Sequence, residues 1–348
     1  MAWANVYDPK YVRPGIFLHF FLGGRGCGKT YGALKGAYED YKSSGHKFYF
    51  MRRTDEERKL TEQFNPFNKV NFKEGWQIVS SPMGKKVSGF YEGERDDEGI
   101  LKPAGQPIGY GLALSTIGSV RGLGLDDPCV DKGLFDEFIA ELHARPIKAE
   151  GEAFLNAIES LNRNRELEGM EPITWYCMAN SNRLDNPLFI TLGIVAIVEK
   201  MIRREQRDYY DERRGFAVHV LRDADFEKLK KQTSIARLTE GSEYYDMAYE
   251  NKFAYNDFTN IRRLDAMGFK PAYAIGDAHL WQRKGQTEYY ASYKDGSFAY
   301  RYDPKLQADQ LLGRSRHAAA FKRAYASGLV TFESYEIKAL LLDFFAIK

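Results

Sequence analysis

The chain has 348 residues, more than one ordinary single-core domain, and this length predicts two domains with a small linker. Lysines and arginines number 50 against 48 acids, so the net charge of +2 gives no bulk attraction for nucleic acid, and contacts with phosphate have to come from local clusters. Three cysteines without CxxC or Cys/His ligand spacing argue against a disulfide framework and a structural zinc site.

The N-terminal segment and the apolar runs bear on localisation. MAWANVYDPKYVRPG has no basic stretch followed by an apolar one, and no run in the chain reaches the roughly 18 apolar residues of a membrane span. The few cysteines suit a reducing compartment. We therefore expect a soluble protein of the cytoplasm that has no membrane partner.

The first elements are predicted to be strand, helix and strand. Residues 15–22 (GIFLHFFL) form an apolar run bounded by glycines, which is typical of a strand buried in a parallel sheet. A glycine-rich turn follows, helical spacing covers 29–43, and 47–51 (KFYFM) is predicted as the next strand. This order indicates an α/β fold whose βαβ connection is right-handed.

Strands and helices continue to alternate further along the chain. From about 76 to 115 short alternating pieces are broken by Gly and Pro, and we interpret them as an inserted hairpin region outside the core sheet. Later buried strands are predicted to end at Phe135, to cover 173–178 (ITWYCM), and to cover 216–221 (FAVHVL). A helix over about 150–166 separates the first two of these.

The C-terminal part has a different pattern. A charged stretch, 222–231, is predicted as a connecting helix. Short aromatic strands of an antiparallel meander, the last two joined by the turn Lys-Asp-Gly, are predicted at 272–275, 288–293 and 297–302. Two apolar-periodic helices that should cover this sheet are predicted at about 315–326 and 332–345. The resulting domains are 1–221, 222–253 and 254–348.

A complete phosphate-binding loop is the strongest motif. It matches GxxxxGK(S/T) between a buried strand and a helix, and reads Gly23-Gly24-Arg25-Gly26-Cys27-Gly28-Lys29-Thr30. Backbone N–H groups of such a loop curl around phosphate, Lys29 reaches the β and γ phosphates, and Thr30 offers its hydroxyl to Mg²⁺. A glycine-rich turn without ligand is the alternative, but it needs no lysine and threonine at the helix start. The motif predicts ATP and Mg²⁺ as ligands.

A pair of acids follows a later buried strand, in Leu134-Phe135-Asp136-Glu137. Acids are common where strands end, but beside a complete phosphate loop this pair resembles a Walker B element. Asp136 would then hold the Mg²⁺ shell, and Glu137 would orient and polarise the attacking water. The pair predicts ATP hydrolysis rather than binding alone.

Three further polar residues are candidates for contact with the γ-phosphate. Arg163, in LNRNRE at a helix end, fits a surface cation beside the helix dipole or an arginine finger that reaches a neighbouring subunit in a ring ATPase. Asn180, after the strand ITWYCMA, is either a γ-phosphate sensor or a turn asparagine. Arg121, in Ser-Val-Arg-Gly, belongs either to another phosphate-facing loop or to a solvated one.

The motifs GGRGCGKT, FDEF, NRNRE and CMAN together resemble the genome-packaging (encapsidation) ATPases of small Salasvirus-type podophages. The likeness covers nearly the whole chain, including 239–253 (TEGSEYYDMAYENKF), which is similar to the family's connector. It implies an ASCE P-loop ATPase domain with a mostly parallel sheet, then a linker, then a small α+β domain of RNase H-like fold that is a vestigial nuclease.

The same resemblance implies roles for individual residues. Arg163 matches the family's trans-acting arginine finger, and Asn180 matches the sensor position. Arg121 matches a basic residue that also crosses the subunit boundary, although an arginine here replaces a lysine and changes a point charge to a planar fork. Asp277 is the only carboxylate near the first meander strand, whereas an active nuclease needs several acids around two metals.

The implied function is that of an ATP-driven motor subunit. The resemblance gives a homomeric ring, a pentamer, that drives double-stranded DNA of any sequence through a portal into a procapsid, with a packaging RNA as a further partner. Its place would be the host cytoplasm and, transiently, the portal vertex. Lysines such as Lys85 and Lys86 could line the DNA pore or lie in a solvated turn. The alternatives are another ASCE translocase or helicase, and an ATP-gated clamp, against which Glu137 argues.

Overall fold

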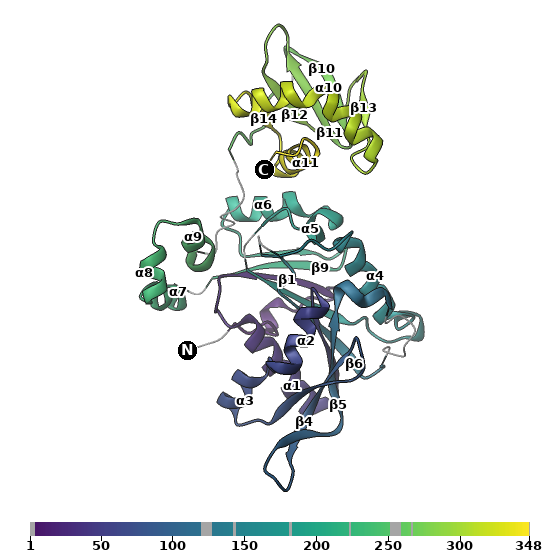
Figure 1. The fold of residues 1–348 in the computed structure, drawn as a ribbon, viewed down its shortest axis with the longest axis vertical. Coiled ribbons are helices and arrows are strands. Elements are labelled where there is room, and N and C mark those ends of the chain that lie inside the picture. Colours follow the sequence, from purple (N-terminus) through teal and green to yellow (C-terminus); the bar gives the residue numbers. More distant parts are fainter. Residues whose placement is uncertain are drawn as a thin grey trace. The chain divides into compact units, whose positions relative to one another are not determined.

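The computed structural model describes residues 4–119, 127–141, 144–180, 183–222, 224–250, 259–265 and 267–347. The chain forms two compact units, Met1–Leu192 with Met201–Tyr255, and Gly193–Lys200 with Asn256–Lys348. Each unit is built on its own β-sheet (Figure 1). No helix among the described residues has the length and apolar character needed to span a bilayer. The domain limits at 221 and 253 stay predictions.

The first unit contains a nine-stranded sheet in the order β3-β4-β5-β2-β6-β7-β1-β9-β8. Its strands are β1 (Leu18–Gly23), β2 (Lys47–Arg52), β3 (Ile78–Pro82), β4 (Ser88–Arg95), β5 (Leu101–Ala113), β6 (Val130–Asp136), β7 (Thr174–Ala179), β8 (Asp208–Asp211) and β9 (Phe216–Leu221). Neighbours from β5 through β2, β6, β7 and β1 to β9 are parallel, and both edges are antiparallel. With β7 between β1 and β6, the predicted ASCE-type α/β fold is confirmed.

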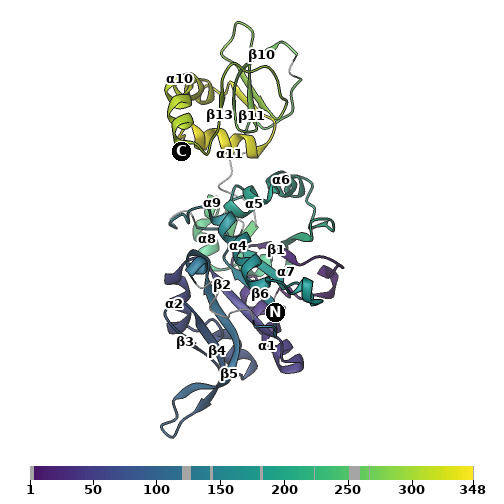
Figure 2. The same ribbon diagram turned by 90° about the vertical axis from the view of Figure 1, so that its right-hand side faces the viewer.

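Helices cover both faces of this sheet (Figure 2). They are α1 (Lys29–Ser44), α2 (Asp55–Gln63), α3 (Asn68–Glu74), α4 (Glu150–Asn162) and α5 (Pro187–Leu192). The next helix, α6 (Val195–Arg203), is divided between the two units. On one face Leu34 of α1 shares a core with Phe21 of β1. On the other, Phe154 of α4 contacts Phe135 and Trp175. Burial on both faces explains why β1, β2, β7 and β9 are nearly continuous apolar runs.

The structure corrects the prediction that the segment from about 76 to 115 is a hairpin region outside the core sheet. β5 pairs in parallel with β2, from Phe48 beside Gly109 to Arg52 beside Ala113, so its second half is a core strand. Its first half pairs with β4 in an exposed two-stranded arm (Figure 1). Four of the glycines and prolines that suggested an insertion, Gly93, Gly99, Pro103 and Gly105, lie in this arm, where the strands are solvated.

Three short helices follow the sheet within the first unit. They are α7 (Ala224–Lys231), α8 (Ser234–Thr239) and α9 (Glu243–Glu250). The connecting helix predicted at 222–231 is thus confirmed as α7. A small core of Ala236, Ala248 and Tyr249 joins α8 to α9. These helices lie in the segment predicted as a linker domain, and that domain assignment stays a prediction.

The second unit contains a five-stranded sheet in the order β13-β10-β11-β12-β14 and, among its described residues, two complete helices besides part of α6. Its elements are β10 (Phe269–Ile275), β11 (Ala278–Arg283), β12 (Tyr289–Ser292), β13 (Arg301–Tyr302), α10 (Gln307–Ala326), β14 (Val330–Phe332) and α11 (Tyr335–Phe344). Phe321 of α10 and Leu341 of α11 share a core with Ile275 and Leu280, so both helices cover one face, as predicted.

The strand order of this sheet differs from the predicted meander. β12 does not pair with 297–302: it pairs with β11 and, in parallel, with β14, while β13 pairs in parallel with β10. The missed strand β11 takes the place next to β10, because Gly276, at φ 52, makes a tight turn between them. The predicted hairpin at Lys-Asp-Gly is therefore wrong.

Candidate active site

The phosphate loop joins the end of β1 to the start of α1. Gly26 and Gly28 have φ values of 77° and 89°, in the left-handed region that glycine enters without steric cost. A pocket of about 310 Å³ opens over this loop. Its lining comprises Arg25, Gly26, Gly28, Lys29, Thr30, Tyr31, Pro66, Lys69, Val70, Asp136, Glu137, Met178, Ala179 and Asn180. The geometry therefore brings the loop, both acids and Asn180 together, as the sequence predicts.

Lys29 is buried at the centre of this pocket. Its Nζ donates to the carbonyl oxygen of Gly23 at 2.8 Å and to Oδ1 of Asn180 at 3.2 Å. Asn180 directly follows β7, the neighbour of β1, so parallel strand ends bring the two side chains together. An ammonium and an amide thus face the same point above the loop, where a terminal phosphate would lie.

Thr30 and Asp136 form the part of the site that could hold a metal. Thr30 Oγ1 donates to Asp136 Oδ1 at 2.8 Å. Burial raises the pKa of the Asp136 carboxyl, while the charge of Arg52 opposes this shift. A hydroxyl and a carboxylate beside a phosphate loop are oxygen ligands of the kind Mg²⁺ prefers, so the residues present fit this ion.

Arg52 is a residue of this site that the sequence analysis missed. It ends β2, next to β6, and its Nη1 lies 2.9 Å from Asp136 Oδ2 while its Nη2 lies 2.6 Å from Glu137 Oε2. Glu137 has φ 55 and a side chain that is 51% exposed, so this contact fixes an otherwise solvated carboxylate. The available signal was an Arg-Arg pair directly after the strand KFYFM, at the same sheet edge.

The linker helices contact the phosphate loop from the same chain. A Cβ added at Gly24 would lie 3.0 Å from the carbonyl oxygen of Ala248 in α9. The Arg25 guanidinium pairs with Glu141 and lies 5.8 Å from the centre of the Tyr244 ring. Burial lowers the pKa of Lys230 in α7 to about 8. The loop is thus packed beneath α7 and α9 rather than open on that side.

Of the predicted residues that the structure describes, Gly23, Gly24 and Cys27 of the loop and Arg163 are absent from the lining of this pocket. Arg163 is the exposed C-cap of α4, with φ 43 and ψ −125, and it is absent from the pocket lining. Arg121 lies outside the described residues. The pocket of a single chain therefore contains the phosphate loop, the two acids and Asn180, but not Arg163.

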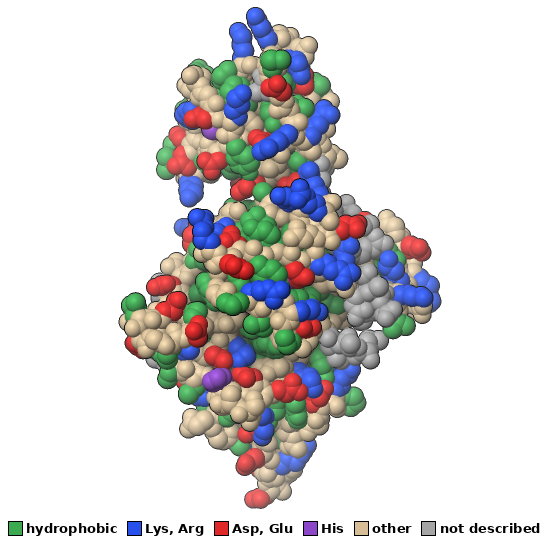
Figure 3. Space-filling view, turned by 180° about the vertical axis from the view of Figure 1, so that it is seen from behind, with side chains coloured by type: hydrophobic (Ala, Val, Ile, Leu, Met, Phe, Trp, Pro, Cys, Tyr) green, Lys and Arg blue, Asp and Glu red, His purple; other side chains and the backbone are tan. Residues whose placement is uncertain are grey.

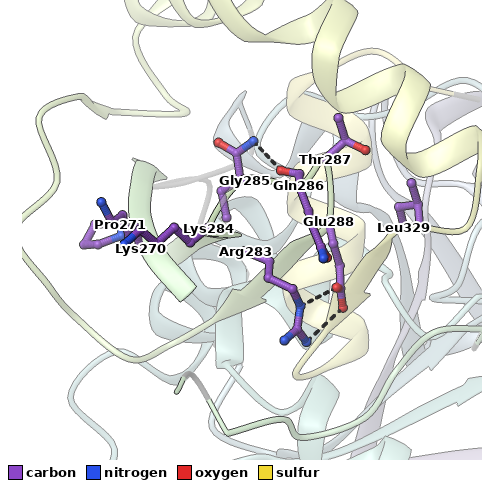
Figure 4. A pocket seen from close by; sticks show the side chains of 10 residues that line it. Lys270, Pro271, Arg283, Lys284, Gly285, Gln286, Thr287, Glu288 and Leu329 are labelled. Carbon is purple, nitrogen blue, oxygen red and sulfur yellow. Dashed lines mark hydrogen bonds and ion pairs between the residues drawn. The ribbon is translucent and has the colours of Figure 1, made fainter. Parts of the chain in front are cut away.

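A larger pocket, of about 830 Å³, lies in the second unit (Figure 4). Its lining comprises Lys270, Pro271, Gln282, Arg283, Lys284, Gly285, Gln286, Thr287, Glu288 and Leu329. Glu288, the only acid in this lining, pairs with Arg283 at 2.5 Å. Asp277 lies in the β10–β11 turn, at the opposite end of β11. The lining of this pocket therefore has one paired carboxylate rather than a group of acids around two metals.

Comparison with known proteins places the chain in a family. A family model described as the podovirus DNA encapsidation protein (Gp16) matches residues 4–346. The chain belongs to this family. The DNA packaging proteins of Bacillus phages phi29 and PZA are each 27% identical over 249 residues, 71% of this chain and 65% of theirs. That of Bacillus phage B103 is 25% identical over 68% of this chain and 64% of its own. Less than two thirds of each relative is matched.

Solved structures share the fold of this family member. A chain of the bacteriophage Phi-29 viral genome packaging motor assembly has a TM-score of 0.66 at 23% identity, over 95% of each chain. A chain of the Phi-28 gp11 DNA packaging motor has a TM-score of 0.58 at 20% identity, over 96% of this chain and 95% of that one. At these identities the likeness shows a common fold across both units.

Proposed function

We propose that this encapsidation-family chain is the ATPase subunit of a motor that moves double-stranded DNA into a procapsid. The observation that carries the proposal is the meeting of the phosphate loop, Asp136, Glu137 and Asn180 at one sheet edge. A water-orienting acid beside a phosphate loop supports turnover rather than a clamp that only binds. Membership of a DNA encapsidation family supports a packaging motor over a helicase.

The chemistry assigns a task to each side chain. Lys29 and the loop N–H groups bind the β and γ phosphates of ATP, and Asn180 contacts the γ-phosphate. Thr30 and Asp136 would hold Mg²⁺, which supplies positive charge to the phosphate oxygens. Glu137 orients the attacking water and polarises it by accepting a hydrogen bond. Arg52, whose Nη2 lies 2.6 Å from Glu137 Oε2, holds that carboxylate in position.

A second subunit completes the site in this proposal. Arg163 is exposed at the end of α4, outside the pocket of its own chain. We assign it to the γ-phosphate of a neighbour in a ring, a pentamer by family resemblance, with Arg121 at the same boundary. Such an arginine can contribute on the order of 10³ to 10⁵ in rate.

DNA contact in this motor is independent of sequence. Acidic and basic side chains are interspersed on the surface drawn in Figure 3, in line with the net charge of +2. Local clusters then have to bind phosphate, and exposed Lys85 and Lys86 in the β3–β4 turn are candidates for the pore. The further proposed partners are the portal and a packaging RNA, reached from the host cytoplasm.

A subunit-mixing assay tests the proposal. Arg163→Ala subunits keep an intact nucleotide site but lack Arg163. Glu137→Gln subunits keep Arg163, but their own nucleotide site cannot hydrolyse ATP. Each is nearly inactive alone, and mixing creates interfaces with one intact partner of each kind, so phosphate release should return in part. If the two variants co-assemble and stay inactive, Arg163 does not act in trans.

A second assay tests the substrate. Two unrelated duplexes should bind with equal affinity that falls steeply with salt, because counterion release supplies most of the binding energy. Base-specific binding would contradict the motor. Strand separation during ATP turnover would favour the helicase alternative, since a packaging motor moves duplex DNA without unwinding it.

A further inference from the structure

A buried ion pair anchors the start of α4. Arg53 directly follows β2, and Glu150 is the first residue of α4. Arg53 Nε lies 2.6 Å from Glu150 Oε1, and Nη2 lies 2.9 Å from Oε2. The residues are only 2% and 3% exposed. Two parallel N–H···O bonds fix both the separation and the orientation of the partners, so the helix start is tied to the end of β2.

The surroundings of Glu150 leave the helix start little freedom. Ala149 caps α4 in the left-handed conformation, at φ 50, and a Cβ on Gly151 would collide with the side chain of Thr191 in α5. A buried ion pair costs desolvation of both charges and often stabilises a fold no more than apolar residues of the same size. Stability alone therefore does not account for this pair, whereas the placing of α4 does.

The other end of α4 presents Arg163. The helix has 13 residues, which makes it about 20 Å long, and Phe154 and Leu161 on its buried face pack it as one rigid piece. Arg163 then has φ 43 and ψ −125, a conformation that non-glycine residues rarely adopt. Strained backbone of this kind concentrates at functional positions. A shift at Glu150 would be carried along the helix to Arg163.

We propose that the Arg53–Glu150 pair is the positioning element that sets where Arg163 meets the neighbouring subunit's site. This inference rests on the proposed function, in which Arg163 acts in trans. Arg53 is also next in sequence to Arg52, which contacts Asp136 and Glu137. The end of β2 thus connects a subunit's own site to the arginine that it offers to its neighbour.

The test places Glu150→Gln in one partner of the mixing assay at a time. In the Glu137→Gln subunit, which donates the arginine, it should reduce the recovered ATPase rate about 10- to 100-fold, since a misplacement of about 1 Å can cost that much. In the Arg163→Ala subunit, which donates the active site, the recovered rate should stay within about twofold of the parent mixture. A role in folding alone would not depend on which subunit carries the change.

Glu152→Gln is the matched control. Glu152 is an exposed acid in the same first turn of α4, so its removal perturbs the helix dipole in the same way without touching Arg53. It should leave the recovered rate unchanged in either subunit. Arg53→Met with Glu150→Met, which leaves no unpaired buried charge, should reproduce the donor-specific loss in chains whose melting temperature is close to the parent's.

The outcomes separate the inference from the function on which it rests. Equal losses in donor and acceptor, or no loss in the donor, overturn the positioning role while leaving Arg163 in trans. No recovery in the parent mixture overturns the trans role and, with it, this inference. If Glu150→Gln does not fold, the double methionine variant decides: recovery at the parent rate with this variant in the donor overturns the proposal.

Discussion

The two sheets of the chain distribute their polar residues in opposite ways. In the first unit parallel strands end at one edge, so Arg52, Asp136 and Asn180 meet the phosphate loop there, although Lys29 and Asn180 are 151 positions apart. In the second unit β10, β11 and β12 are antiparallel, and successive turns alternate between two ends. Parallel strands concentrate chemistry at one edge. In the antiparallel sheet, residues at the strand ends are instead divided between two opposite edges.

The largest expected effect is the loss of ATP binding and turnover at the nucleotide pocket of the first unit. Lys29→Ala should weaken ATP binding about 100-fold or more, because the proposed mechanism gives this buried ammonium the contact with the β and γ phosphates. Glu137→Gln should leave ATP affinity within a few-fold while reducing turnover about 1,000-fold, because the role proposed for this acid is to prepare the attacking water. Nucleotide titration and phosphate release measure the two effects separately.

Lys42→Ala, on the exposed end of the same helix, serves as the control and should change neither quantity. Turnover at the normal rate in Glu137→Gln would contradict the assignment of that residue.

A smaller loss is expected at Arg52. Arg52→Gln should reduce turnover about 10- to 100-fold, since Glu137 loses its fixed position. The guanidinium charge also lowers the pKa of Asp136 against the effect of burial, so its removal should shift the acid limb of the rate profile to higher pH. Rates between pH 5.5 and 8 test this. Arg95→Gln in the exposed arm is the control, and an unshifted profile would refute the electrostatic part.

The free energy of unfolding should depend on pH through two histidines of the first sheet, which lie outside the nucleotide pocket. His19 Nδ1 lies 3.1 Å from His219 Nε2, and burial lowers the pKa of His19 to about 4. The unfolded chain then binds more protons between pH 6.5 and 4, so stability is full above 6.5 and declines towards 4, by about 3 kcal/mol in all. Denaturant titrations at pH 7.5 and 5 measure it. His19→Phe should flatten this dependence, and an undiminished slope would rule out His19 as its source.

No effect is expected at Asp277. The full chain with excess Mg²⁺ or Mn²⁺ should not cut duplex DNA, and Asp277→Ala should leave ATP turnover unchanged, because this acid lies alone in the β10–β11 turn. Gel analysis of linear and circular duplexes tests the first statement. Cleavage that vanished in Asp277→Ala would place a metal site in the second unit and remove the contrast between the two sheets.

The sequence predicted most of the parallel sheet and its phosphate loop, because both leave local signals. Continuous apolar runs mark β1 and β7, the apolar residues that end at Phe135 mark the end of β6, and the glycines of the loop are required where φ is positive. Arg52 was missed because its partners, Asp136 and Glu137, are more than 80 positions away, and only the pairing of β2 with β6 brings them together. β11 was missed because AHLWQR, short and half-polar, has no distinctive period until β10 and β12 flank it.

The place of β1 in the sheet has a consequence for synthesis. Its two partners are β7 and β9, which end at Ala179 and Leu221, so the strand that carries the phosphate loop has neither neighbour until most of this unit has left the ribosome. Pairing over such separations is slow, because loop closure precedes any gain from contacts. A nascent chain of fewer than about 180 residues therefore exposes an unpaired apolar strand, and chaperone capture at that length would limit the yield of active subunits.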